Sequence, residues 1–284
     1  MKVYGKIVKT LPKERIIKVL SQKKIHYFYM SRKLFKDFGP YFYYNPYIFV
    51  NVSAEKKQYG DYHCHEIDSF NKIVQSTKRD KVVYYNLAAI RKGVRNLLLK
   101  TKNKLFLDLE YSLPPYYQSF SHVAEIIQYG IVVEDESGNI IFEDGSLVKP
   151  QKRYSLNRRT LKFIGKKRED FNGACDYKEF YNLLKWCIEK YDAKIIAWGR
   201  NDILALENSF KINRINDLDI RNRYINFMQV MKNYYNIKID LGLFNTYQEL
   251  SGVEMEEQKH DALEDAMLVR EIYRIFKEKV LSEA

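Results

Sequence analysis

The stretch KLFLDLEYS, residues 104–112, decides how the second half of this chain is expected to fold. Its apolar residues indicate a buried strand, and Asp108 and Glu110 interrupt them. Residues two apart in a strand share one face of the sheet, so we expect the two carboxylates to project together. Two neighbouring carboxylates on a buried strand repel each other and lose hydration. A hard, oxygen-seeking cation such as Mg²⁺ or Mn²⁺ would compensate them, whereas zinc would need Cys or His ligands nearby.

Two further segments carry ionisable residues at the ends of predicted elements. Asp202 follows a short apolar run and begins a predicted helix. His260 lies at the start of the last predicted helix, and Asp265 falls one turn inside it. Each feature alone has an ordinary explanation, namely a solvent-exposed strand end, a helix N-cap and a surface histidine. Their occurrence together, in this order, is much less expected by chance.

Together these segments resemble the three motifs of the DEDDh 3′–5′ exonucleases, which have a ribonuclease H-like fold. DLE at 108–110 is similar to the first motif, Asp202 within WGRNDILALENS to the second, and HDALEDA at 260–266 to the third. The resemblance covers roughly residues 104–280. It extends to the branch that contains the histone-mRNA 3′ exonucleases and the bacterial KapD proteins, because YINFMQV and GLFNTYQELSGV sit where that branch has similar runs. Tyr111-Ser112 departs from the small residues and Thr that the family usually has after the acid pair.

The resemblance implies a two-metal phosphodiesterase. It implies that Asp108 bridges two Mg²⁺ or Mn²⁺ ions and that Glu110 and Asp265 help to hold one of them. Asp202 would act directly or through a water, and His260 would be the general base. The implied reaction removes nucleoside 5′-monophosphates from the 3′ end of single-stranded nucleic acid, with RNA favoured over DNA. The acids outside the motifs are interpreted as solvated charges: Asp217, Asp219, Asp261 and Glu264.

The charge of the chain is unevenly distributed. Its 284 residues carry a net charge of +12, but residues 1–100 hold 21 basic and 7 acidic side chains while the remainder holds 27 and 29. Such a basic half suggests an anionic partner, either nucleic acid or an acidic membrane surface. With 46% hydrophobic residues, wholesale disorder is excluded. Three scattered cysteines and no run of 18 apolar residues favour a reducing cytoplasm and no membrane span.

Residues 1–78 predict a small all-β barrel of the OB type. Five short apolar or aromatic runs separated by Lys-rich turns indicate its strands: 3–8, 16–20, 25–30, 47–52 and 62–67. One helical turn is expected between the third and fourth runs, before Gly39-Pro40 ends it. Residues 79–103 have helical spacing and are interpreted as a connecting helix, so the exonuclease domain would begin at residue 104.

The segment KKIHYFYMS, residues 23–31, faintly resembles the third strand of cold-shock domains. By that resemblance Tyr27 and Tyr29 would stack on bases, with Lys23 and Lys24 beside the phosphates. The alternative, that these tyrosines pack inside the barrel, stays open at this stage. His63-Cys64-His65 is interpreted as a strand rather than a metal site, because alternation separates the cysteine from the two histidines.

The pattern of residues 104–284 predicts an α/β domain with a mixed sheet. After the strand at 104–112, strands are expected at 125–134, 139–148 and 194–198, and helices at 177–191, 203–210, 224–235, 243–250 and 261–279. Two other functions remain: a non-catalytic nucleic-acid-binding protein with a vestigial exonuclease domain, and a DNA-directed exonuclease of the repair or proofreading type. A membrane-surface role for residues 1–100 would instead require an amphipathic basic helix there.

Overall fold

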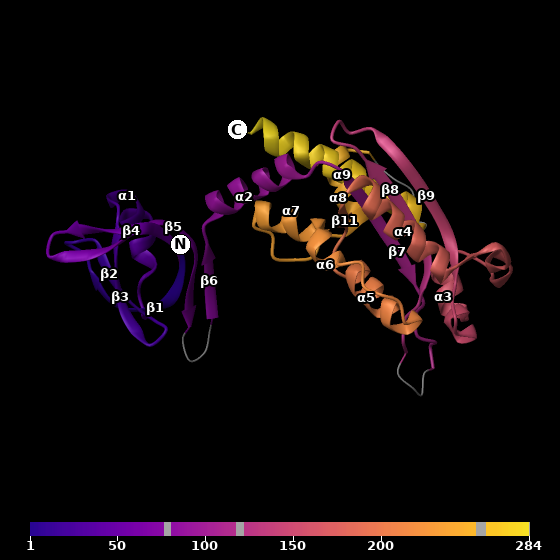
Figure 1. Cartoon of the computed structure of the whole chain (residues 1–284), viewed down its shortest axis with the longest axis horizontal. Coiled ribbons are helices and arrows are strands. Elements are labelled where there is room, and N and C mark those ends of the chain that lie inside the picture. Colours follow the sequence, from indigo (N-terminus) through magenta and orange to yellow (C-terminus); the bar gives the residue numbers. More distant parts are fainter. Residues whose placement is uncertain (77–80, 118–121, 254–259, 284) are drawn as a thin grey trace. The chain divides into compact units, whose positions relative to one another are not determined.

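The computed structural model describes residues 1–76, 81–117, 122–253 and 260–283. It divides into two compact units, Met1–Gly93 and Val94–Ala284. The boundary expected between residues 78 and 79 lies outside the described residues. Each unit contains one six-stranded sheet (Figure 1). Within the described part of the chain, no helix has the length and apolar character needed to span a membrane.

The N-terminal unit is built on a closed five-stranded barrel. Its strands are β1 (Lys2–Leu11), β2 (Ile16–Ser21), β3 (Lys24–Met30), β4 (Tyr47–Tyr59) and β5 (Tyr62–Ser76). Neighbours pair antiparallel in the order β3-β2-β1-β4-β5, and parallel pairing of β3 with β5 closes the ring. Helix α1 (Arg32–Phe38) and the 3-10 turn η1 (Gly39–Tyr41) fill the connection from β3 to β4. The OB-like barrel expected from the sequence is confirmed.

Alternation along the strands separates the barrel core from its surface. Phe28 and Met30 of β3 point inward with Ile48 and Val50 of β4, and all four are at most 2% exposed. Phe70 of β5 completes this cluster, which α1 covers on one side. The basic side chains therefore lie outside a conventional apolar core.

Residues 81–85 contradict the predicted connecting helix. They form strand β6 (Lys81–Tyr85), which pairs antiparallel with β5, and helix α2 begins only at Leu87 and ends at Lys100. The run KVVYY is rich in β-branched and aromatic residues, which favour strands. Pairing with the long strand β5 and packing of Tyr84 against the barrel core decided its conformation over the helical spacing.

The C-terminal unit has the predicted mixed sheet. Its strands are β7 (Lys104–Tyr111), β8 (Ile126–Glu134), β9 (Ile140–Lys149), β10 (Cys175–Asp176), β11 (Lys194–Ala197) and β12 (Tyr224–Asn226), in the order β10-β9-β8-β7-β11-β12. The β7–β8–β9 pairings are antiparallel, whereas β11 runs parallel to β7 and β12. This order, 3-2-1-4-5 for the strands other than β10, confirms the ribonuclease H-like arrangement.

Two layers of helices cover this sheet (Figure 1). The helices described in this unit after β7 are α3 (Arg158–Phe163), α4 (Tyr177–Tyr191), α5 (Asn201–Asn213), α6 (Ile220–Arg223), α7 (Phe227–Tyr235), α8 (Leu243–Ser251) and α9 (Ala262–Ser282), with 3-10 turns η2 (Arg153–Leu156) and η3 (Arg168–Gly173). The helix expected at 224–235 begins three residues late, because 224–226 pair with β11 as an edge strand.

The two faces of β7 differ in chemistry. Leu105, Leu107 and Leu109 pack in a large core cluster with residues of α4 and α5. Phe106, on the opposite face, packs edge-on against Tyr273 of α9, with ring centroids 5.5 Å apart. By strand alternation Asp108 and Glu110 share the Phe106 face. The acids thus lie on the side of the sheet that α9 covers.

Candidate active site

Strand β7 carries two of the predicted site residues. Asp108 is partly buried and Glu110 is 7% exposed. In the β7–β8 ladder they lie opposite Gly130 and Gln128, respectively. Because the strand is central and paired on both sides, its backbone holds the two carboxylates at fixed positions.

Asp202 reaches the same region from α5. It lies in the first turn of this helix, just after β11, and is 5% exposed. Burial raises the pKa of Asp202 to about 7, partly offset by hydrogen bonds from the backbones of Asp202 and Leu109 and the Tyr224 side chain. The parallel pairing of β11 with β7 brings the carboxyl ends of the two strands to one edge, where Asp202 meets the β7 acids.

Two glycines determine how closely α9 approaches the sheet. A Cβ atom on Gly130 would lie 2.1 Å from the carbonyl oxygen of Ala262, and one on Gly145 would lie 2.9 Å from Cβ of Leu263. Gly130 pairs with Asp108 on one side and with Gly145 on the other. The first turn of α9 therefore rests on bare backbone, which allows residues at its start to reach the acids of β7. A glycine within the apolar run 126–134 was the sequence signal for this close approach.

A buried ionic network holds the opposite end of β7 to α9. The Lys104 ammonium, fully buried, lies 3.0 Å from Glu134 Oε1, and Arg270 Nε of α9 lies 2.7 Å from the other oxygen of Glu134. Removing one partner of such a buried set leaves an uncompensated charge, so the network fixes the helix in place. Sequence reasoning did not identify these three residues.

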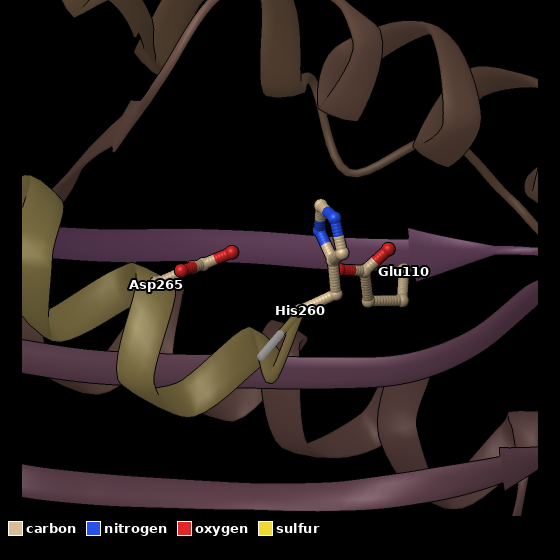
Figure 2. A group of neighbouring side chains, drawn as sticks. All are labelled: Glu110, His260 and Asp265. Atoms are coloured by element: carbon tan, nitrogen blue, oxygen red, sulfur yellow. The ribbon is translucent and has the colours of Figure 1, made fainter. Parts of the chain in front are cut away.

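Glu110, His260 and Asp265 come together in one cluster (Figure 2). One potential ligand atom from each residue lies within 4.8 Å of the others. His260 Nδ1 is 3.7 Å from Glu110 Oε1, and the ring and the carboxylate lie side by side. Asp265, 6% exposed, projects from the first turns of α9.

The electrostatics of the site are dominated by crowded negative charge. Burial raises the pKa of Asp108 well above its usual range, and the charges of Asp202, Asp265 and Glu110 raise it further. Burial, followed by the charges of Asp265 and Asp202, raises the pKa of Glu110 to about 8. A buried group of carboxylates whose charges raise one another's pKa suits a hard divalent cation. The donor set therefore fits Mg²⁺ or Mn²⁺.

His260 is supported by a residue that sequence reasoning missed. The Phe163 ring stacks on the imidazole, with centroids 4.1 Å apart and planes 25° apart. Phe163 ends α3, which Asn157 caps through the amides of Arg159 and Thr160. The Leu113 amide, just beyond β7, donates to the Thr160 hydroxyl at 2.9 Å. The strand that carries the acids and the ring that supports His260 are thus connected through α3. No periodicity in the sequence signals this contact.

The pKa of His260 is lowered by burial. A lowered pKa favours the neutral imidazole at neutral pH, which has a lone pair to accept a proton. The position of His260 beside the acid cluster is therefore compatible with the base role that the sequence predicts.

Asp261 is not the solvated charge that we expected. Its carboxylate caps α9 by accepting from the Leu263 and Glu264 amides, and it also accepts from Gln128 Nε2 at 2.9 Å. Lys166 Nζ lies 3.6 Å from Asp261 Oδ2, the oxygen that accepts from Gln128. Asp261 thus fixes the start of the helix that carries the site, whereas Asp217 is exposed as expected.

The predicted nucleic-acid-binding residues lie in the N-terminal unit. Tyr27 stacks on Tyr62, with centroids 5.6 Å apart, and Lys23 and Lys24 are exposed at the turn between β2 and β3. Tyr29 stacks closely on Tyr59, at 3.7 Å. In the His-Cys-His segment, Cys64 is buried and His63 is exposed within β5.

No protein-family model matches the sequence, and no curated protein matches it significantly. Solved structures do match. The nuclease domain of 3′hExo, a DEDDh family member bound to rAMP, aligns with a TM-score of 0.56 at 17% identity, over 63% of this chain and 94% of that one. The C-terminal unit has the fold of the DEDDh exonucleases.

Two further matches agree. A full-length 3′-exonuclease aligns with a TM-score of 0.54 at 15% identity, covering 63% of this chain and 62% of that chain. Cell-death related nuclease 4 (CRN-4) aligns with a TM-score of 0.53 at 20% identity, covering 63% and 64%. The matched region thus spans under two thirds of either protein. These matches confirm, at the level of the fold, the resemblance to DEDDh exonucleases that the sequence predicts.

Proposed function

We propose that the protein is a metal-dependent 3′–5′ exonuclease that hydrolyses single-stranded nucleic acid, RNA in preference to DNA, to nucleoside 5′-monophosphates. The exonuclease-fold unit would carry the reaction, and the basic barrel would hold the strand. The proposed domains follow the sequence division at residues 78 and 103, except that residues 81–85 join the barrel sheet.

The observation that carries this proposal is the convergence of four acids and one histidine from separate elements. Asp108 and Glu110 come from β7, Asp202 from α5, His260 from the segment before α9, and Asp265 from α9 itself. Burying four carboxylates in one place is unfavourable, and a scaffold that served only to bind would gain nothing from it. A vestigial site would not need to retain the whole set.

The residues divide the chemistry between them. Asp108, Glu110, Asp202 and Asp265 would hold two Mg²⁺ or Mn²⁺ ions. Bound divalent ions would supply charge stabilisation at the attacking and leaving oxygens of the phosphodiester. His260, neutral at neutral pH, would accept a proton from the attacking water at a ring nitrogen. As that oxygen bonds to phosphorus, the bond to the 3′ oxygen breaks, leaving a shortened strand and a nucleoside 5′-monophosphate.

The proposed preference for RNA is supported by the similarity of this chain to exonucleases whose structures involve RNA or a ribonucleotide. The 3′hExo nuclease domain was crystallised with rAMP, and a further 3′-exonuclease with a TM-score of 0.53 at 14% identity recognises a histone mRNA stem-loop. That alignment covers 63% of this chain and 83% of that one. The sequence resemblance also favours the branch of histone-mRNA 3′ exonucleases.

Digestion of end-labelled strands tests the proposal. The full chain is incubated with 5′-labelled and 3′-labelled single-stranded RNA and DNA, with Mg²⁺, with Mn²⁺ or with EDTA. We expect metal-dependent release of labelled mononucleotide from the 3′ end and progressive shortening of the 5′-labelled strand, faster for RNA.

Matched variants make the test specific to the site. Asp108→Asn removes one charge at constant size and is expected to reduce hydrolysis to background, whereas exposed Asp217→Asn is expected to leave it unchanged. If the wild-type protein digests none of the substrates with either metal, the proposed enzymatic activity would be rejected in favour of a non-catalytic nucleic-acid-binding protein. Faster digestion of DNA would reject the RNA preference alone.

A further inference from the structure

Strand β6 turns one side of the barrel into a four-stranded sheet, β1-β4-β5-β6. On its outer side lies a surface that we call the wing face, formed by Lys2, Tyr4, Lys6, Tyr47, Phe49, Lys72 and Tyr85. One row of paired positions crosses it from strand to strand: Tyr4, Phe49, Lys72 and Tyr85. Since adjacent strands lie ~4.8 Å apart, this row extends over roughly 14 Å.

Aromatic rings on the wing face are open to solvent. Tyr4 is 60% exposed and stacks on Phe49, with centroids 5.9 Å apart and planes 19° apart. Tyr85 is 55% exposed at the far end of the row, and Tyr47, in the adjacent row, is 48% exposed. Exposed aromatic rings gathered on one face are unusual on a surface that contacts only water.

The charged residues in the two rows of the wing face are lysines. Lys72 Nζ lies 4.2 Å from the centre of the Phe49 ring, and Lys2 and Lys6 alternate with Tyr4 along β1. At the described positions that share this face in the two rows, no residue is acidic. Aromatic rings interleaved with lysines are complementary to a polyanion whose bases offer flat rings, which is a single strand of nucleic acid.

The rings that the sequence singled out are less available for stacking. Tyr29 has Tyr59 on one ring face at 3.7 Å, and its hydroxyl accepts from Arg15 at 2.9 Å. Tyr27 contacts both Tyr62 and the Lys18 ammonium, the latter 4.9 Å from the ring centre. Tyr27 and Tyr29 are only partly exposed, whereas Tyr4 and Tyr85 are 60% and 55% exposed, so the β3 rings offer less surface to a base.

We propose that the wing face is a stacking platform for single-stranded nucleic acid, separate from the β3 tyrosines and from the acid cluster. Bases stack on Tyr4 and Tyr85, while Lys2 and Lys6 neutralise phosphates. The proposal shares its ligand class with the proposed function but requires no hydrolysis, so each can fail independently of the other.

Binding of a 5′-fluorescein-labelled oligouridylate, measured by fluorescence anisotropy, tests this platform. The full chain carries Asp108→Asn and is kept in EDTA so that the strand stays intact. Tyr4→Leu/Tyr85→Leu removes both rings but keeps apolar side chains, whereas Tyr4→Phe/Tyr85→Phe keeps the rings. We expect the leucine pair to weaken binding by at least about fivefold and the phenylalanine pair to bind normally.

The alternatives give distinct results. Unchanged affinity of the leucine pair would overturn the proposal, as would equal losses in both pairs, which would indicate hydroxyl contacts instead of stacking. A loss confined to Tyr27→Leu/Tyr29→Leu would place the platform on β3 and also overturn it. Circular dichroism of each variant verifies that the barrel remains folded.

The salt dependence tests the lysines separately. Lys2→Gln/Lys6→Gln is expected to reduce the slope of log affinity against log salt by ~0.7 for each phosphate that is no longer neutralised. The control is Lys185→Gln on α4, whose ammonium pairs with Glu189 and is 47% exposed. A slope equal to that of the control would show that Lys2 and Lys6 bind no phosphate and would overturn their role.

Discussion

The residues proposed to act on nucleic acid lie in different environments in the two units of this protein. In the C-terminal unit, acids lie on a covered face: Glu110, Asp202 and Asp265 are 5–7% exposed. In the N-terminal unit, the core is apolar, and rings such as Tyr4 and lysines such as Lys2 face solvent. Buried charge is unfavourable and calls for a specific compensating ligand, whereas exposed charge is compatible with many partners. The first arrangement therefore identifies chemistry more sharply than the second.

The largest expected effect concerns the covered site of the C-terminal unit, which consists of Asp108, Glu110, Asp202, His260 and Asp265. His260→Gln keeps a polar side chain but removes the base, so we expect kcat to fall by ~10²–10⁴-fold. Nucleic-acid binding in EDTA should be unchanged, because the proposed platform is on the other unit. Single-turnover digestion and anisotropy measure the two quantities. Equal losses of binding and turnover would contradict the separation between the units.

The Phe163 ring tests whether the covered site depends on support outside the acids. Phe163→Leu removes the stacking on His260 and is expected to lower kcat by ~10–100-fold with little change in KM, by analogy with residues that orient metal-site ligands. Phe163→Tyr should restore most of the rate because it keeps the ring. Similar losses in both variants would show that the stacking is not what matters.

Gly130, against which the first turn of α9 packs, tests how the acid cluster is assembled. Gly130→Ala places a Cβ where the Ala262 backbone lies, so we expect a loss of ~1–3 kcal/mol in unfolding free energy together with lower activity. Gly93→Ala is the control, since that position in α2 is open and the helix should become more stable by ~0.5–1 kcal/mol. Urea denaturation measures both changes. A neutral Gly130→Ala would mean that α9 can move without penalty.

The smallest expected effect is a pH-dependent response to metal. The folded-state pKa values of Glu110 (about 8) and Asp202 (about 7) are raised above their ordinary values, so metal-free stability falls as pH rises from the ordinary values through this range. Mg²⁺ relieves the repulsion between ionised carboxylates, and it should therefore raise Tm more near about pH 8 than near about pH 6. Differential scanning fluorimetry measures the shift, expected to be ~2–4 °C for each kcal/mol gained. Asp108→Asn should diminish it.

Much of the covered site follows from local rules that a sequence displays. Strand alternation is enough to place Asp108 and Glu110 on one face, and helix periodicity is enough to place Asp265 one turn inside α9. The order of the apolar runs also predicts the mixed sheet, because each strand must be buried against helices. The positions of these residues relative to their own elements were therefore predictable.

Other features depend on which elements become neighbours. Residues 81–85 have helical spacing but form β6, because β5 extends far enough to pair with them. Phe163 meets His260 although nearly a hundred residues separate them in the chain. Asp261 became a cap with two further partners only because β8 and Lys166 approach the start of α9. Such contacts have no local sequence pattern.

The sequence by itself determined which residue types each half of the chain carries: acids within apolar runs need compensation wherever the chain folds, and a basic half favours an anionic partner. Tertiary structure alone decided which groups meet and which face outward. Alternation divides a strand into two faces but does not say which face a closing barrel encloses, so Tyr4 and Tyr29 could be distinguished only after the strands had paired. Local rules act within an element, whereas packing between elements decides exposure.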